Sequence, residues 1–307
     1  MIRRPPRSTQ SRSSAASDVY KRQVHLQCQS EYSVKNSLVR VSKLIDSVKE
    51  AGMKSVALTD DMSLFSVIKF YQKATNAGIK PIIGAKISVD FDSGHYDVLL
   101  LCQNHEGYLN LSELISKAYL NEQGISIVSV TEEQLISHQK GLLMIATPTS
   151  SDISQLLLTN EPELAHTKAE HWQSIFNDRY YFSAQRTGRH SDENLLNLTI
   201  ELGVKLGIPV VATNDVQFLR KSDFDAHEAR ICIAEGALLD DSRRLKFFSD
   251  SQYLKTPDEM SELFKDYPQL LANASEVAKR CNLHFKLFEK NYLPAFPTPK
   301  GKSIAEF

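Results

Sequence analysis

The sequence predicts an α/β protein whose strands alternate with helices, the pattern of a parallel barrel or a doubly wound sheet. The first observation is a complete strand, helix, strand unit over residues 54–90, KSVALTDDMSLFSVIKFYQKATNAGIKPIIGAKISVD. The second is that this alternation persists, giving about seven apolar strands by residue 213. The third is size: 307 residues, of which 42% are hydrophobic and 24% charged, suffice for one large core or two modest ones.

The central unit begins with a short apolar run over residues 55–59 that ends in Asp60 and Asp61. The next fifteen residues place apolar side chains on one helical face, and Gly78 is suited to the position just past a helix end. A second apolar run over residues 82–85 favours a strand parallel to the first. Function in parallel α/β folds collects at the carboxyl ends of strands, which directs attention to Asp60, Asp61 and Lys86.

The flanking segments repeat this pattern. Residues 24–28 form a predicted strand, and a helix that ends at Gly52 follows it, with the apolar positions Leu38, Val41, Leu44, Ile45 and Val48. Further strands are expected at 97–102, 142–146, 180–183 and 210–213. Further helices are expected at 161–176, at 192–206 and around Leu111, Leu114, Ile115 and Ala118. From residue 223 the pattern becomes helical, so we expect a helical carboxyl-terminal extension.

The two ends of the chain differ from the rest. Residues 1–23 are rich in Arg and Ser and resemble a translated sequencing adapter, so we interpret them as a non-native, disordered tail. The predicted domain then covers residues 24–285. The proline-spaced residues 286–307, with Pro294, Pro297 and Pro299, are predicted to start a linker to a part of the protein that is absent.

Composition excludes several classes of protein. A formal net charge of −1 argues against a protein whose main role is to coat nucleic acid. The four cysteines form no CxxC pair, which fits a reducing cytoplasm better than a disulfide framework or a thiolate zinc site. No apolar run approaches the roughly 20 residues that a membrane helix needs. We therefore expect a soluble, cytoplasmic protein.

Six segments resemble one family in content, order and spacing: HLQCQSEYSVKNSL, GMKSVALTDDMSLFSVIKFYQKATNAGIKPIIGAK, GYLNLSELISKAY, PVVATNDVQF, DFDAHEARICI and NASEVAKRCN. They resemble the amino-terminal PHP (polymerase and histidinol phosphatase) domain of the bacterial replicative DNA polymerase III alpha subunit. The resemblance implies a distorted, TIM-like barrel of seven strands. It also implies that the catalytic aspartates of DNA synthesis, with their Mg²⁺, lie beyond Phe307, so that this fragment needs no cofactor.

In metal-binding members of that family, nine His, Asp and Glu side chains at the strand ends hold a cluster of ions. The resemblance places these nine positions on Gln27, Gln29, Asn36, Asp61, Lys86, Asp97, Thr187, Asp215 and Gln217. Only Asp215 keeps the family's chemistry. Amide oxygens are weak neutral ligands that cannot replace imidazole at a transition metal. The resemblance therefore implies a degenerate site.

A remodelled oxygen site for Mg²⁺ or Mn²⁺ could use Asp61, Asp97 and Asp215, because hard cations accept carboxylates. Lys86 argues against it, because an ammonium repels a divalent ion by several kcal/mol at about 5 Å. We expect instead an ion pair between Lys86 and an aspartate, with no metal bound. Asp60 is expected to cap a helix or bond backbone amides, and His25 to be packed in a strand.

Three functions remain open at this point. In the first, the domain supports a polymerase core and is the docking site for the separate proofreading 3'-5' exonuclease subunit. The other subunits of the replicase are expected as further partners. In the second, it is itself a metal-dependent phosphoesterase or proofreading exonuclease. The third is direct DNA binding, which the sequence does not favour because the barrel stretch lacks interleaved basic and aromatic residues.

The pair His227-Glu228 resembles half of an HExxH motif, but its second histidine is missing.

Overall fold

The structure is a computed structural model and describes residues 23–91, 94–121, 128–241, 243–244, 246–287, 289 and 297. The predicted tail over residues 1–23, apart from Gln23, lies outside the described residues. So does most of the predicted linker over residues 286–307.

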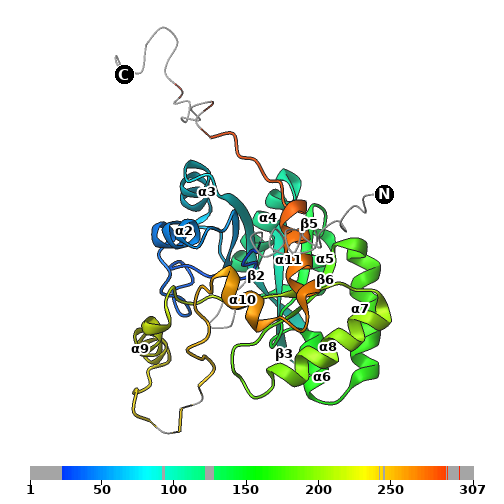
Figure 1. Cartoon of the computed structure of the whole chain (residues 1–307). Helices are drawn as coiled ribbons and strands as arrows, with labels where there is room; N and C mark the ends of the chain where they lie inside the picture. The colour runs from blue at the N-terminus through cyan, green and yellow to red at the C-terminus, as the bar shows by residue number, and fades with distance from the viewer. Residues whose placement is uncertain are drawn as a thin grey trace, which may run out of the picture.

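A single curved sheet forms the centre of the molecule (Figure 1). Its strands follow the order β1 (Ser55–Asp61), β2 (Lys80–Phe91), β3 (Gly94–Cys102), β5 (Leu142–Ala146), β6 (Tyr180–Ala184) and β7 (Val210–Ala212). The short β4 (Val130–Thr131) pairs with the far end of β2. The seven strands confirm the predicted α/β class.

The sheet is mixed, which corrects the expectation of a parallel one. β3 runs antiparallel to both of its neighbours, β2 and β5, whereas the other pairs are parallel. The physical reason is the short connection between β2 and β3. Only two residues separate β2 from β3, and a parallel partner would need a crossover of a dozen or more residues.

The segment over residues 24–29 brings the two edges of the curved sheet together. On one side it accepts backbone hydrogen bonds from β1, with Ala57 N to His25 O at 2.9 Å and Thr59 N to Cys28 O at 2.8 Å. On the other side, Cys28 forms a parallel bridge with Val216, just after β7. Residues 24–28, predicted to be a strand, contain one isolated bridge and no regular strand, and this extended segment closes the sheet into a distorted barrel.

The predicted helices pack outside the sheet (Figure 1). They are α2 (Val41–Glu50), α3 (Val67–Asn76), α4 (His105–Asn121), α7 (Pro162–Phe176) and α8 (Asp192–Leu206). Two short helices escaped prediction, α5 (Glu132–Ser137) and α6 (Asp152–Leu158). The helical extension contains α9 (Phe224–Glu235), α10 (Pro257–Leu263) and α11 (Pro268–Arg280), and 3₁₀ turns lie at η1 (Asn177–Arg179) and η2 (Lys221–Asp223).

Helix α11 closes the end of the barrel where the parallel strands begin. Its apolar side chains join the inward-facing strand residues in one buried cluster, which contains Ala57, Leu99, Leu143, Val211, Ala274, Val277 and Ala278. Asn273 Nδ2 donates to the Val210 carbonyl at 2.8 Å, and Lys80 Nζ donates to the Ala278 carbonyl at 2.8 Å. Both contacts lie at strand starts, so the carboxyl ends of the strands are left as the place for a site.

Candidate functional site

A lysine and two aspartates meet where β1, β2 and β3 come together. Asp61 and Lys86 are register partners in the parallel pair β1 and β2, and Asp97 lies early in β3. Because β3 is antiparallel, its early residues lie at the same edge as the carboxyl ends of β1 and β2. Lys86 Nζ lies 3.6 Å from Asp61 Oδ2 and 3.3 Å from Asp97 Oδ2, and its side chain is 17% exposed. The predicted ion pair is therefore a bridge between two carboxylates.

The charges at this site shift one another's protonation. Burial lowers the pKa of Lys86, but the nearby carboxylates of Asp61, Asp97 and Asp215 outweigh it and hold that pKa above its ordinary value. Burial raises the pKa of Asp61, and the Lys86 ammonium opposes this rise. Lys86 therefore stays charged across the physiological range, and its ammonium offsets the repulsion between the two neighbouring carboxylates.

Asp215 is held by three side-chain amides rather than by a cation. Its Oδ1 accepts hydrogen bonds from Gln27 Nε2 at 2.9 Å and from Gln217 Nε2 at 2.8 Å. Its Oδ2 accepts from Gln252 Nε2 at 2.8 Å. An amide that faces a carboxylate must present its NH₂ group, so these glutamines act here as donors. Gln252 was not predicted, because it lies 37 residues downstream and no local pattern connects it with Asp215.

The remaining predicted positions, Asn36, Gln29 and Thr187, differ in their contacts. Asn36 joins the site, since its Nδ2 donates to Asp61 Oδ2 at 3.2 Å. Gln29 is buried, and its Oε1 has no hydrogen-bond partner. Thr187 faces away, because its backbone N–H and hydroxyl both donate to Asp192 Oδ2, at 2.5 and 3.0 Å. The structure therefore brings most of the predicted positions together and assigns Thr187 to the start of α8.

Asp60 forms a separate, fully buried network beside the site. It accepts from the Ser30 backbone N–H at 2.6 Å and from the Ser30 hydroxyl at 2.8 Å. The hydroxyls of Ser33 and Ser66 also donate to it, at 2.8 and 2.6 Å. Ser66 immediately precedes α3, so Asp60 joins the loop after the first strand to the start of that helix. Its role is to bond a backbone amide and hydroxyls, in line with the sequence expectation.

Comparison with known proteins places this arrangement in a family. The family model described as the PHP domain matches residues 25–187, which is more than half of the chain. The chain belongs to the PHP domain family.

The curated relatives that this PHP domain matches include proteins much longer than this chain. It is 42% identical over 287 residues to the DNA polymerase III subunit alpha of Pseudomonas fluorescens, covering 92% of this chain and 24% of that protein. It is 40% identical over 278 residues to the corresponding subunit of Escherichia coli strain K12, covering 90% and 24%. The chain thus spans about a quarter of the length of the curated relatives it matches.

Among solved structures, an amidohydrolase from Chromobacterium violaceum with bound sulfate and no metal matches at a TM-score of 0.46. The two are 11% identical, over 68% of this chain and 96% of that one.

The residues of this PHP domain do not fit a divalent cation. The Lys86 ammonium lies between Asp61 and Asp97, where it would repel the ion, and both oxygens of Asp215 already accept hydrogen bonds. In the described part of the chain, no three His, Cys, Asp or Glu side chains form a ligand set. At these positions the amides of Gln27, Gln217 and Asn36 and the ammonium of Lys86 contact carboxylates.

Two histidines of the PHP domain serve packing. His25 is buried, its Nε2 lies 2.8 Å from the Lys255 carbonyl, and burial lowers its pKa to about 4. His227 is also buried, with Nε2 at 2.7 Å from the Asn36 carbonyl, while its neighbour Glu228 pairs with Arg244. The half HExxH motif therefore belongs to the packing of α9.

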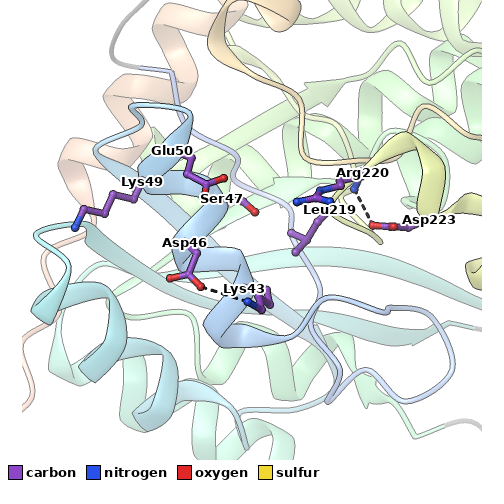
Figure 2. A pocket seen from close by; sticks show the side chains of 8 residues that line it. All are labelled: Lys43, Asp46, Ser47, Lys49, Glu50, Leu219, Arg220 and Asp223. Carbon is purple, nitrogen blue, oxygen red and sulfur yellow. Dashed lines mark hydrogen bonds and ion pairs between the residues drawn. The ribbon is translucent and has the colours of Figure 1, made fainter.

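A surface pocket of about 490 Å³ lies between α2 and the segment before α9 (Figure 2). It is lined by Lys43, Asp46, Ser47, Lys49, Glu50, Leu219, Arg220 and Asp223. Three basic and three acidic side chains balance each other there, and Lys43 Nζ lies 4.0 Å from Asp46 Oδ2. This balance favours no charged ligand.

Among the described residues, no helix has the length and apolar character to span a bilayer.

Proposed function

We propose that this chain is the amino-terminal PHP domain of a bacterial DNA polymerase III alpha subunit and that it acts as a scaffold. In this role it supports the polymerase core and docks the proofreading 3'-5' exonuclease subunit. The proposal rests on the long relatives that match at 40–42% identity over their amino-terminal quarter. Template-directed DNA synthesis, with its Mg²⁺ and its contacts to DNA, would belong to the part of such a polypeptide that follows.

The observation that carries the scaffold role is the bridge from Lys86 to Asp61 and Asp97. A hydrolase of the PHP type would need a bound ion at these strand ends to activate water. Here the ammonium supplies the positive charge that the carboxylates require, and it can activate no water. The chemistry of the residues therefore supports a structural function of the strand ends.

The scaffold role is tested by binding. The 307-residue chain is titrated with the purified proofreading exonuclease subunit of the same bacterium in a calorimeter. We expect a one-to-one complex with a dissociation constant of about 1 μM or lower. An absence of heat and of co-elution at several times this concentration would remove the docking role.

The competing hydrolase role is tested by metal content. After purification without chelators, elemental analysis should find Zn and Mn at well below one ion per chain. Addition of Mn²⁺ or Zn²⁺ should also leave a phosphodiester substrate uncleaved. Stoichiometric metal together with cleavage would replace the scaffold role by that of a metal-dependent phosphoesterase or proofreading exonuclease.

A further inference from the structure

The residues that follow α11, 281–287, form neither a helix nor a strand and run as an extended segment (Figure 1). Their exposure alternates. Cys281 and Leu283 are buried and Phe285 is half-buried, whereas the residues between them are exposed. This period of two is typical of an extended chain that packs one face on the protein beneath it. We call residues 281–287 the strap.

Asn282 fastens the first half of the strap to the sheet. Its backbone N–H donates to the Gln103 carbonyl, immediately after β3, at 2.7 Å. Its Oδ1 accepts a hydrogen bond from Nζ of Lys80, the first residue of β2, at 2.9 Å, and its Nδ2 donates to the Lys279 carbonyl in the last turn of α11 at 2.8 Å. The strap is therefore tied to two strands as well as to its own helix.

Phe285 fastens the second half of the strap to two helices. Its ring lies 5.0 Å from the ring of Tyr71 on α3, with an interplanar angle of 78°, and 4.8 Å from the ring of Tyr108 on α4, with an angle of 84°. Both are the edge-to-face arrangement that aromatic pairs favour. The Phe285 backbone N–H also donates to Tyr71 Oη at 3.3 Å. We call these three rings the aromatic clamp.

The composition of the strap agrees with these contacts. Its sequence, CNLHFKL, contains no glycine, serine or proline. A flexible tether is typically rich in glycine and serine, and a stiff spacer in proline. The strap instead supplies apolar side chains at alternate positions, so its sequence suits a segment that is held against the barrel.

From these observations we infer that the strap gives the polypeptide a fixed exit from the barrel. It holds the chain on α3 and α4 as far as Phe285, and it thereby sets the direction in which a following polymerase core leaves this domain. The inference rests on the proposed function, because it takes such a core to follow this chain. It adds how the scaffold would position the core.

Hydrogen exchange of the 307-residue chain tests whether the clamp holds the strap. Phe285→Ala removes both ring contacts, and Tyr71→Phe removes only the hydroxyl that accepts the Phe285 N–H. The matched control is His284→Ala, because this side chain is exposed in the same strap. Phe285→Ala should speed exchange of the amides of residues 282 and 285 by about tenfold or more, and the control by less than about twofold. Tyr71→Phe should speed exchange at residue 285 alone.

Small-angle X-ray scattering of the full-length alpha subunit tests the fixed exit itself. Phe285→Ala should give a larger radius of gyration than wild type, and His284→Ala should give the wild-type value. Thermal unfolding confirms that each variant is folded. If Phe285→Ala does not fold, Tyr71→Phe decides, because it keeps all three rings.

Two results would overturn the inference. Unchanged exchange at both amides would mean that the clamp does not hold the strap. Faster exchange with unchanged scattering would mean that the strap is held but does not position the core. Neither result bears on the docking of the exonuclease subunit, which the calorimetric titration tests separately. Conversely, failure of that titration would remove the docking role and leave the fixed exit standing.

Discussion

Replacement of Lys86 by methionine tests the central electrostatic interpretation. Its ammonium lies 3.3 and 3.6 Å from two carboxylates, which gives about 5 kcal/mol of gross attraction for each pair at an effective dielectric constant of about 20. Desolvation of the ammonium offsets part of this attraction. Because the three side chains retain 17–32% exposure, we expect a net loss of about 2 to 3 kcal/mol, somewhat below the value for a fully buried pair.

The assay for Lys86→Met is thermal and urea unfolding of the whole chain. For a chain of this length, a loss of this size should lower Tm by about 3 to 5 °C. The matched control is Lys49→Met on α2, where the side chain is exposed and has no ion pair within the described residues. If Lys86→Met melts within about 1 °C of wild type, the ammonium does not stabilise the strand ends and the reasoning is refuted.

The same variant has a predicted pH dependence. In the wild type, burial raises the pKa of Asp61, and Lys86 opposes the rise. Without Lys86, only influences that raise this pKa remain, so the carboxyl binds a proton at a higher pH. A carboxyl with a raised folded pKa destabilises the fold above that pKa, and the penalty disappears as pH falls. The stability difference between variant and wild type should therefore shrink between pH 8 and pH 5; growth of the difference would contradict this account.

Three further predictions follow from buried contacts. Gly84→Ala would place a Cβ 2.3 Å from the Leu100 carbonyl oxygen, so urea unfolding should show a loss of about 3 kcal/mol or more, and retained stability would disprove the close approach. Asp60→Ala removes the acceptor of four hydrogen bonds and should lose about 3 kcal/mol, whereas Asp46→Ala on the surface of α2 should change little. The pKa of His25 is lowered to about 4, so the folded protein favours the neutral imidazole. The contribution of His25 to the free energy of unfolding is therefore present above pH 6.5 and is lost as pH falls towards 4. The pH profile of His25→Gln should be flatter over this window, and an unchanged profile would exclude His25 as its cause.

The central strand, helix, strand unit could be predicted closely because its signals are local. Apolar periodicity located α3, and Gly78, with φ of 73°, ends the turn that follows it, as the sequence indicated. The direction of β3 could not be predicted in this way, because an apolar run has no direction of its own. Helix α11 posed a similar problem. An amphipathic pattern requires a buried face, but it does not distinguish the outside of a barrel from its floor.

The strand-end site shows the same division between local and distant signals. The resemblance identified Lys86, Asp61 and Asp97 as positions of one site, and the structure brings them into contact. It did not indicate Gln252, whose loop reaches Asp215 only through the packing of the carboxyl-terminal extension. Thr187 is the opposite case. Its family position lies at the site, but Asp192 on the adjoining helix provides a nearer acceptor and turns the side chain away.

The contacts of the carboxylates at the strand ends have a common electrostatic explanation. Neighbouring, partly desolvated carboxylates repel each other, so they require donors or a cation nearby. Asp215 obtains these donors from three neutral amides, and Asp61 and Asp97 share one ammonium. An amide donor leaves the charge of Asp215 in place, and this charge in turn raises the pKa of Lys86. The two halves of the site are therefore coupled. Neutralising Asp215 should lower the pKa of Lys86, although no hydrogen bond or ion pair joins these two described side chains.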